Sequence, residues 1–354
     1  MQGILKNAWY VAAWADELGG DPIERTMLGS LVVLYRTSDG RPTALSGLCP
    51  HRRLPLVQGR VEGDRLSCGY HGLTFDAAGT CVSIPCQRNV PAGANIRAYP
   101  AVESWGLIWL WMGDPDRANP DTIIHIENYG DPAWGYNRGA PMTYECNYLY
   151  ITDNLLDPSH VAWVHQSSFG DSSCEAVPMQ IRSDDNGVTV HRWIKDAPVA
   201  PFYRDLVPFS GNADRLQQYE VRYPALAVIK AVFLPAGTGG GHPGDVLPEN
   251  AFIMDSYNFI TPESDGRSRY YWFQVRNVRT DDNALSERMS ASVLAAFSED
   301  LAVLNGVQRG MDLADEPAIS IMSDAGPLRF RHRLDELIKA EGEPILGPEA
   351  AVRT

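Results

Sequence analysis

Two short segments, Cys49-Pro50-His51 and Cys68-Gly69-Tyr70-His71, decide how the first third of this chain of 354 residues is interpreted. Each segment carries one cysteine and one histidine, and residues 52–67 separate the two segments. Pro50 and the glycines at positions 69 and 72 are typical of loops that fold closely around a bound group. The pattern therefore predicts two short loops that place two thiolates and two imidazoles around one site.

These four side chains are the ligand set of a [2Fe-2S] centre in which histidines replace the cysteines on one iron. Cys49 and Cys68 would hold one iron, and His51 and His71 the other. Neutral imidazoles remove negative charge from such a cluster and raise its reduction potential, which suits a relay that accepts electrons from a ferredoxin-like donor. A structural zinc ion is the alternative, although zinc sites favour Cys-x2–4-Cys and His-x3–5-His pairs over two mixed loops.

Short β-rich runs bounded by glycine and proline surround these loops, at residues 27–35, 66–68, 73–75 and 81–84. Residues 105–112 are interpreted as a buried strand that closes this region, and the breaker-rich stretch 113–120 follows it. The chain is long enough for two domains with a core each. We therefore expect a small all-β domain at residues 1–118 and a second domain at 119–354.

The second domain mixes strand and helix patterns. We expect a strand at 143–150, a helical stretch at 153–165 that Pro158 interrupts, and successive strands through 188–276. Apolar periodicity and end signals predict two further helices, at 285–308 and at 327–340. This order indicates an α+β domain, with an antiparallel sheet and helices on one side of it.

A second group of candidate metal ligands has the spacing Asn154-x-x-Asp157-x-x-His160-x-x-x-x-His165. On an ideal helix of ~3.6 residues per turn the two histidines would point ~140° apart, so at least one must lie where the helix ends or distorts. Pro158 supplies such a break, because it lacks the backbone donor and clashes with the preceding turn. Two histidines and one carboxylate form the facial triad of Fe(II) oxygenases, so a third ligand is expected elsewhere.

The helix predicted at 285–308 offers Glu287, Glu299 and Asp300 as this third ligand. Asp300 shares a face with apolar residues, whereas Glu299 is rotated away by ~100°. The apolar residues of this face are Met289, Val293, Ala296, Val303, Leu304 and Val307. A carboxylate on an apolar face is costly to bury unless it is paired or metal-bound, so we predict Asp300 as the ligand. The alternative is a core aspartate that a cation or backbone donors satisfy.

The composition excludes several classes of partner. With 44 acidic and 30 basic residues the net charge is −14, which repels nucleic acids and anionic lipids. No stretch approaches the ~18 apolar residues of a membrane span, and the first residues lack the pattern of an export signal. We therefore expect a cytoplasmic protein with no nucleic-acid or membrane partner. Cysteines are too sparse for a disulfide scaffold, so those at 81, 86, 146 and 174 are predicted to be reduced thiols.

Together these motifs resemble the Rieske non-haem iron oxygenases. The first two segments, with Arg52 after His51 and a glycine after His71, are similar to the Rieske motif of aromatic oxygenases. The spacing from Asn154 to His165, with a distant aspartate after an acidic residue, resembles the catalytic domain of that family. Further segments resemble the group of vanillate O-demethylase, toluenesulfonate methyl monooxygenase and dicamba O-demethylase, at 7–13, 111–115, 153–157, 260–264 and 297–300.

The resemblance implies an all-β Rieske domain followed by an α+β catalytic domain of the helix-grip type. It implies that His160, His165 and Asp300 bind a mononuclear Fe(II). It also implies a homotrimer, in which Asp157 links an iron-ligand histidine to a Rieske histidine of the neighbouring subunit. Asn154 would orient water or dioxygen; its alternative role is helix capping beside Asp153.

The activity that the resemblance implies is that of the terminal oxygenase component of a multicomponent monooxygenase. Dioxygen and electrons from NADH would hydroxylate a methyl or methoxy group of an aromatic acid, as in O-demethylation that releases formaldehyde. A separate flavin and iron–sulfur reductase would oxidise NADH, since this chain has no dinucleotide-binding fingerprint. The alternatives are a cis-dihydroxylase of aromatic rings and, in another class, a Rieske-type electron-transfer protein.

An aromatic acid needs an apolar pocket and a cation. Aromatic and apolar residues that could line the pocket lie at 202–209, 228–234, 257–259 and 270–273, although a plain sheet core also explains them. The candidate cations are Arg204, Lys230, His242 and Arg276. Each also fits a surface or salt-bridge role, so none is singled out.

Overall fold

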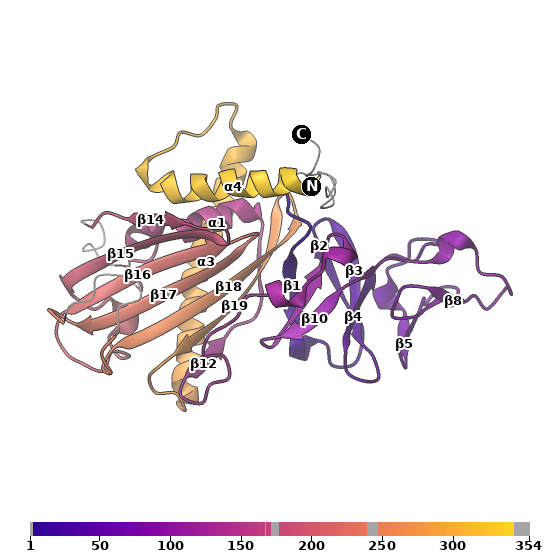
Figure 1. Ribbon diagram of the computed structural model, residues 1–354, viewed down its shortest axis with the longest axis horizontal. Helices are drawn as coiled ribbons and strands as arrows, with labels where there is room; N and C mark the ends of the chain where they lie inside the picture. The colour runs from indigo at the N-terminus through magenta and orange to yellow at the C-terminus, as the bar shows by residue number, and fades with distance from the viewer. Residues whose placement is uncertain (1–2, 167, 171–176, 239–246, 343–354) are drawn as a thin grey trace, which may run out of the picture. The chain divides into compact units, whose positions relative to one another are not determined.

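The computed structural model describes residues 3–166, 168–170, 177–238 and 247–342 (Figure 1). The contacts within the chain divide it into two compact units. One unit extends to Ile123 and includes the segment that begins at Arg331, and the other spans Ile124–Phe330. Helix α4, Ala325–Glu341, therefore contributes residues to both units. The domain boundary between residues 118 and 119 stays a prediction.

The first unit is built from short antiparallel strands. They are β1 (Trp9–Trp14), β2 (Ile23–Met27), β3 (Ser30–Arg36), β4 (Pro42–Ser46), β5 (Arg60–Glu62), β6 (Arg65–Ser67), β7 (Thr74–Phe75), β8 (Cys81–Ser83), β9 (Ala98–Tyr99), β10 (Ala101–Ser104) and β11 (Leu107–Trp111). Their sheets have the orders β1-β11-β10, β2-β3-β4-β9 and β5-β6-β7-β8. Every residue of β11 is buried, so the buried strand expected at 105–112 is confirmed. The prediction of an all-β first domain is also confirmed.

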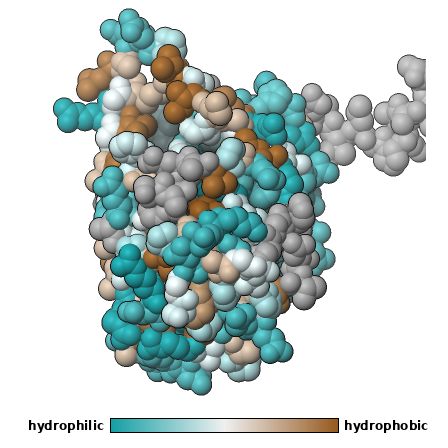
Figure 2. All heavy atoms as spheres, turned by 90° about the vertical axis from the view of Figure 1, so that its left-hand side faces the viewer, coloured by the Kyte–Doolittle hydropathy of each residue, from teal (hydrophilic) through white to brown (hydrophobic). Residues whose placement is uncertain are grey.

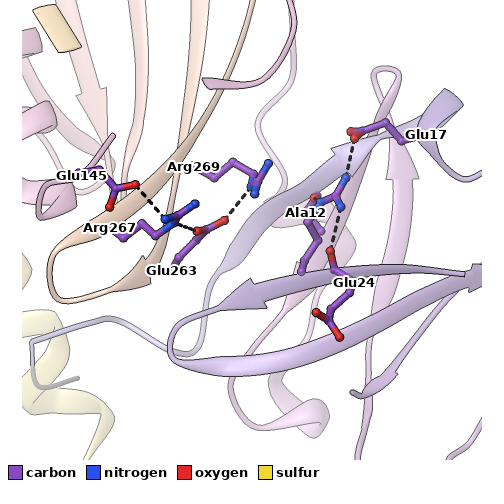
Figure 3. Close-up of polar contacts among 8 residues, drawn as sticks. Ala12, Glu17, Glu24, Glu145, Glu263, Arg267 and Arg269 are labelled. Atoms are coloured by element: carbon purple, nitrogen blue, oxygen red, sulfur yellow. Dashed lines mark hydrogen bonds and ion pairs between the residues drawn. The ribbon is translucent and has the colours of Figure 1, made fainter. Parts of the chain in front are cut away.

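Arg25, on β2, joins separate parts of the first unit through Ala12, Glu17 and Glu24, which are labelled in Figure 3. Its guanidinium donates to the backbone oxygen of Ala12 at 3.0 Å and to that of Glu24 at 2.9 Å, and it pairs with the carboxylate of Glu17 at 2.5 Å. A planar guanidinium with five donors can satisfy several acceptors at once. Arg25 thereby ties β2 to β1 and to the turn that follows β1.

The second unit is dominated by one antiparallel sheet of the order β12-β19-β18-β17-β16-β15-β14, with β13 also paired to β19 (Figure 1). Its strands are β12 (Gly135–Arg138), β13 (Met142–Tyr144), β14 (Gln180–Ser183), β15 (Gly187–Ala197), β16 (Ala213–Arg222), β17 (Leu226–Pro235), β18 (Phe252–Ser264) and β19 (Arg267–Arg276). Helix α1 (Tyr148–Leu156) packs across β15 to β18, and α3 (Asn283–Leu313) packs on β12, β13 and α1. The prediction of an α+β domain with helices against an antiparallel sheet is confirmed.

The strand predicted at 143–150 is wrong in its second half. The strand β13 ends at Tyr144, and α1 begins at Tyr148. Asn147 caps this helix, because its side-chain oxygen accepts a hydrogen bond from the N–H of Leu149 at 2.9 Å. The cap gives residues 148–150 helical backbone, although their β-rich composition favours a strand.

Helix α3 is longer than the helix predicted at 285–308, and its buried face is shorter than expected. Met289, Val293, Ala296, Asp300 and Leu304 are buried, as predicted. The side chains expected next along that face, at positions 303 and 307, are 43% and 39% exposed. A helix of 31 residues is about 46 Å long, so it extends past the elements that cover its first half.

Glu263, near the end of β18, is a buried carboxylate that two arginines neutralise (Figure 3). The Nε atoms of Arg267 and Arg269 each lie 2.7 Å from its oxygens, and Arg267 also contacts Glu145 at 2.8 Å. Burying a carboxylate without such partners would be costly. The turn between β18 and β19 therefore holds the segment that immediately precedes α1.

The surface in view in Figure 2 is mostly hydrophilic, with hydrophobic residues gathered mainly in its upper half. Among the residues that the structure describes, no helix is both long and apolar enough to cross a membrane. Cys81, Cys86 and Cys146 are free thiols, as predicted. Cys174 lies outside the described residues.

Gly79→Ala is expected to destabilise the protein by about 2–4 kcal/mol. Gly79 has a φ of 78°, and an added Cβ would lie 2.1 Å from the carbonyl oxygen of Ile96. Gly63 is the matched control, because its φ is 61° and nothing lies within 4 Å of an added Cβ. Gly63→Ala should cost only the left-handed backbone, about 1 kcal/mol. Urea unfolding of both variants at equal iron content measures the difference, and equal losses would contradict the steric argument.

Candidate metal centres

The two cysteine-histidine segments form two loops with the same backbone pattern, which we call the cluster loops, residues 49–54 and 68–73. In each, the cysteine N–H donates to the carbonyl of a leucine, from Cys49 to Leu54 at 3.0 Å and from Cys68 to Leu73 at 2.8 Å. In each, the cysteine carbonyl accepts from a residue of positive φ. These are Arg53 (φ 60°, 2.9 Å) and Gly72 (φ 73°, 3.1 Å). The cluster loops are therefore closed by local hydrogen bonds between backbone groups.

The cluster loops place their thiols inside and their imidazoles outside. Cys49 and Cys68 are buried in the core around the β5–β8 sheet. His51 and His71 are exposed in this chain, with ring centroids 4.6 Å apart. Burial raises the pKa of the Cys49 thiol, and the neighbouring Cys68 raises it as well. Two buried sulfur ligands and two outer imidazoles fit a [2Fe-2S] cluster whose histidine-bound iron is the more exposed.

The second site is built on the break in the helical segment after α1. Helix α1 ends at Leu156, a short 3-10 turn covers Pro158–His160, and α2 covers Val161–Val164. The interruption predicted at Pro158 is confirmed. It turns the two histidine side chains toward each other, with ring centroids 5.3 Å apart. The break thus brings together two side chains that a continuous helix would separate.

Asp300 of α3 completes a group that can hold one metal ion. The ligand atoms of His160, His165 and Asp300, here called the triad, all lie within 4.8 Å of one another. Asp300 Oδ1 is 3.1 Å from Nε2 of His165 and 3.7 Å from Nε2 of His160. In the described part of the chain, this is the one such group of three or more histidine, cysteine or acidic ligands. The four cluster-loop residues do not form one, so a two-iron cluster fits them better than a single zinc ion.

The surroundings of Asp300 favour a cation at the triad. Asp300 is only 6% exposed, and no donor among the residues that the structure describes makes a hydrogen bond to its Oδ1. Asp300 Oδ1 and Nε2 of His165 lie 3.1 Å apart, which suits two ligands that face a shared ion. An isolated buried carboxylate is costly, so the alternative of a core aspartate satisfied by protein donors does not account for Oδ1. Two imidazoles and one carboxylate suit Fe(II).

Contacts on the far side of each imidazole hold the triad in place. Nδ1 of His165 lies 2.7 Å from the carboxylate of Glu299, and Nδ1 of His160 lies 2.5 Å from the backbone oxygen of Asp157. Both contacts direct Nε2 toward the site, which is the usual arrangement for metal-bound histidines. Burial lowers the pKa of His160. Burial also acts to lower the pKa of His165, but Asp300 and Glu299 together raise it.

Glu299 is a site residue that the sequence argument discarded. Glu299 is rotated by ~100° around the helix from Asp300, so it does not face the metal site, as predicted. The same rotation brings its carboxylate to Nδ1 of His165. The signal that would have found it is the pair of adjacent acids, one for the metal and one for the imidazole behind it. Metal-ligand histidines commonly donate to a carboxylate in this way.

Asp157 and Asn154 are both half-buried, and neither lines the cavity that contains the triad. The carboxylate of Asp157 accepts from the N–H of Ser159 at 3.0 Å and from its hydroxyl at 2.5 Å, which caps the 3-10 turn. Asn154 lies in the last turn of α1, and Asn147 is the N-cap of that helix. The alternative role of Asn154 as a cap is therefore wrong. The catalytic roles of Asp157 and Asn154 stay predictions.

The triad lies in the wall of a largely apolar cavity. A row of residues paired across four neighbouring strands contributes to it, Tyr219 on β16, Ile229 on β17, Ser256 on β18 and Gln274 on β19. The other lining residues are Leu155, Val161, Phe169, Tyr203, Arg215, Met254, Val293, Ala296 and Phe297. The sheet and α3 thus enclose the metal-binding group on an apolar, aromatic surface.

The residues suggested for a substrate pocket are only partly found there. Tyr203 and Ile229 come from two of the expected segments, whereas the segments 257–259 and 270–273 contribute no lining residue. Arg204, Lys230 and Arg276 do not line the cavity, and His242 lies outside the described residues. The arginine that does line it is Arg215, which the sequence argument did not consider.

Glu299→Ala is expected to lower the affinity for the metal at the triad by about 10- to 100-fold, because the imidazole of His165 loses the acceptor that orients it. Iron retained after dialysis against a weak chelator measures this loss, and the cluster absorbance should stay unchanged. Glu287→Ala removes an exposed carboxylate from the same helix and is the control. Equal iron retention in both variants would rule out the positioning role.

Comparisons with known proteins match the two parts of the chain that carry these residues. Residues 8–100 match the Rieske [2Fe-2S] domain, and residues 144–340 match the vanillate O-demethylase oxygenase C-terminal domain. A putative toluene-4-sulfonate monooxygenase iron–sulfur subunit of Comamonas testosteroni is 40% identical over 96% of this chain and 98% of its own length. A vanillate O-demethylase oxygenase subunit of a Pseudomonas species is 33% identical, over 96% of each chain.

A solved structure supports the same assignment. Dicamba monooxygenase bound to 3,6-dichlorosalicylic acid superposes with a TM-score of 0.87 at 28% identity, over 96% of this chain and 99% of that one. The similarity therefore includes both units and the residues between the two sites. The chain belongs to the Rieske non-haem iron oxygenases, in the group that contains the oxygenase subunits of vanillate O-demethylase and toluene-4-sulfonate monooxygenase.

Proposed function

We propose that this chain is the terminal oxygenase component of a multicomponent monooxygenase that hydroxylates a methyl or methoxy group of an aromatic acid. Oxidative O-demethylation with release of formaldehyde is the proposed reaction. The observation that carries the proposal is the position of the triad, which lies in the wall of an apolar cavity with aromatic residues around it. A pure electron-transfer protein would need the cluster loops but not this second site.

Each set of ligands has its own task in this proposal. Cys49 and Cys68 hold one iron of the [2Fe-2S] cluster, and His51 and His71 hold the other. His160, His165 and Asp300 hold Fe(II). The metal centres, when bound, supply the electrons and the dioxygen chemistry that place one oxygen atom on the substrate methyl carbon. The protein has to bind the substrate, orient its methyl group and exclude water.

The cavity walls suit that task. Phe169, Tyr203 and Phe297 offer flat apolar surfaces for an aromatic ring, and the apolar lining keeps bulk water from the triad. Hydroxylation of a methoxy carbon gives a hemiacetal, which breaks down to a phenol and formaldehyde. One dioxygen and the two electrons of one NADH then account for the phenol, the formaldehyde and one water.

A separate flavin and iron–sulfur reductase is the proposed electron source. It would oxidise NADH and pass the electrons one at a time to the cluster. The net charge of −14 suits a reductase with a basic docking surface. We also propose a cytoplasmic homotrimer, in which Asp157 links the triad of one subunit to a cluster histidine of the next. Asn154 is proposed to orient water or dioxygen beside the triad.

The test is a screen of methoxylated and methylated aromatic acids with the metal-loaded protein, NADH and a surrogate reductase. A methoxylated substrate should give formaldehyde and phenol in a one-to-one ratio, matched to the dioxygen and NADH consumed. A methylated substrate should give the hydroxymethyl product instead. A cis-diol product would show that the protein is a ring dihydroxylase. Cluster reduction without any oxygenated product from the whole panel would show that it is not a monooxygenase of this class.

A further inference from the structure

Arg215 places a positive charge in the wall of the cavity that contains the triad. It lies on β16 and is only 4% exposed. Among the described residues that line the cavity, the other ionisable groups of acidic or basic type are His160, His165 and Asp300. Those three form the triad. Arg215 is therefore the basic residue outside the triad among the described residues of the cavity wall.

The guanidinium of Arg215 is held in a defined position near the triad. Its Nη1 donates to the backbone oxygen of Phe169 at 3.2 Å. Its central carbon lies 5.3 Å from the ring centroid of Tyr203 and 5.1 Å from that of Phe233, within the range of cation–π contacts. The ring of Phe169 in turn lies 6.2 Å from that of the triad residue His165. Arg215 and the triad thus share Phe169 as a neighbour.

A second polar group in the cavity also points to a polar ligand. Ser256 is 4% exposed, and its buried hydroxyl has no hydrogen-bond partner among the residues that the structure describes. It lies on β18, in the row of lining residues described above. A polar atom of a ligand in the cavity would give this hydroxyl a hydrogen-bond partner. The cavity therefore combines an apolar wall with one cation and one hydroxyl.

We propose that Arg215 binds the carboxylate or sulfonate of the substrate and so selects aromatic acids over their neutral analogues. This inference rests on the proposed function. A planar guanidinium matches the two oxygens of a carboxylate or sulfonate and binds them with charge-assisted hydrogen bonds. With the acid group held at Arg215, the ring lies along Phe169 and Tyr203, and the opposite end of the substrate faces the triad. Ser256 donates to or accepts from a further polar atom of the ring substituents.

The test measures binding without turnover. The metal-loaded protein is titrated anaerobically in a calorimeter with two matched pairs of probes. They are 4-methoxybenzoate with its methyl ester, and 4-toluenesulfonate with 4-toluenesulfonamide. Wild type should bind the anion more tightly than the neutral partner in at least one pair. Arg215→Gln should weaken binding of that anion by about 10- to 100-fold and change binding of the neutral partner by less than about 3-fold.

Two further variants make the result specific. Arg215→Lys keeps the charge but loses the planar fork, so its affinity for the anion should lie between those of wild type and Arg215→Gln. Arg222→Gln removes a charge from the same strand, where Arg222 pairs with Glu220 at 2.5 Å and does not line the cavity. Its affinity for the anion should stay within about 2-fold of wild type. Iron content and circular dichroism confirm that each variant is folded and loaded.

The outcomes separate this inference from the proposed function. If wild type shows no preference for the anion in either pair, the inference is wrong. Equal losses for anion and neutral partner in a loaded Arg215→Gln protein would show that Arg215 only supports the loop at Phe169. If Arg215→Gln does not fold, an unchanged affinity of Arg215→Lys for the anion would also overturn the inference. If Arg215 selects the anion but no acid yields formaldehyde or a hydroxymethyl product, the inference stands and the proposed reaction fails.

Discussion

Replacing His160 by alanine is expected to remove the iron of the triad and to reduce substrate turnover by about three orders of magnitude or more. The variant leaves only His165 and Asp300 as ligands, which is too few to hold Fe(II) firmly. Asp300 Oδ1, to which no described residue donates a hydrogen bond, would then be a buried charge without a cation. The cluster loops belong to the other unit, so the [2Fe-2S] cluster should remain.

The measurement for His160→Ala compares total iron with acid-labile sulfide. Total iron should fall by one atom per chain, whereas acid-labile sulfide and the electron paramagnetic resonance signal of the reduced cluster should not change. His332→Ala is the control, because that histidine is on α4 and its side chain is 80% exposed. Unchanged iron content in His160→Ala would rule out the triad as the mononuclear site. Loss of both iron and sulfide would point to general unfolding instead.

Asp157→Asn is expected to leave both metal centres loaded and to reduce coupled turnover by about 100-fold or more. The asparagine side chain keeps an oxygen that can accept from the N–H and hydroxyl of Ser159, so the 3-10 turn should persist. The contact of the His160 ring is with the backbone oxygen at this position and is also kept. The substitution therefore removes the negative charge of the proposed link between subunits while the local fold is retained.

The measurement for Asp157→Asn is formaldehyde formed per cluster oxidised, after the cluster has been reduced beforehand. A loss at this step with normal cluster reduction by the reductase would locate the defect between the two metal sites. Asp184→Asn is a matched control, since its carboxylate caps a turn through the N–H groups of Asn186 and Gly187 and lies outside the cavity. Turnover of Asp157→Asn at the wild-type rate would contradict the linking role.

Much of both metal sites could be predicted from the sequence because their ligands are set by short-range geometry. The cluster loops close through hydrogen bonds within a few residues, from Cys49 to Leu54 and from Cys68 to Leu73. Pro158 breaks the helical segment locally and redirects the histidines on either side of it. Asp300 could be predicted from the apolar periodicity of α3 alone, because the first part of the predicted buried face is buried in the structure. Residue type and spacing were sufficient for these ligand-bearing segments, whose deciding contacts lie within a few residues or on one helix.

Other features depended on neighbours that the sequence does not reveal. The strand expected at 143–150 gives way to a helix at Tyr148, which Asn147 caps. The side-chain amide of Asn147 also donates a hydrogen bond to the carbonyl of Asp265, in the distant turn between β18 and β19. Val303 and Val307 follow the apolar period of α3 but are exposed, because burial needs a packing partner as well as a pattern. The apolar periodicity predicted the helix correctly, whereas the elements that pack against α3 decide which of its apolar residues are buried.

The sequence by itself determined which residues can bind metal and which order of strands and helices carries them. Only the tertiary structure decided what lies behind and around those ligands. Glu299 reaches a histidine 134 positions earlier in the chain, and Arg215 contacts the backbone of Phe169, 46 positions away. Such contacts depend on helix rotation and strand register across the whole sheet. Those are set by the summed packing of distant residues, which no local pattern records.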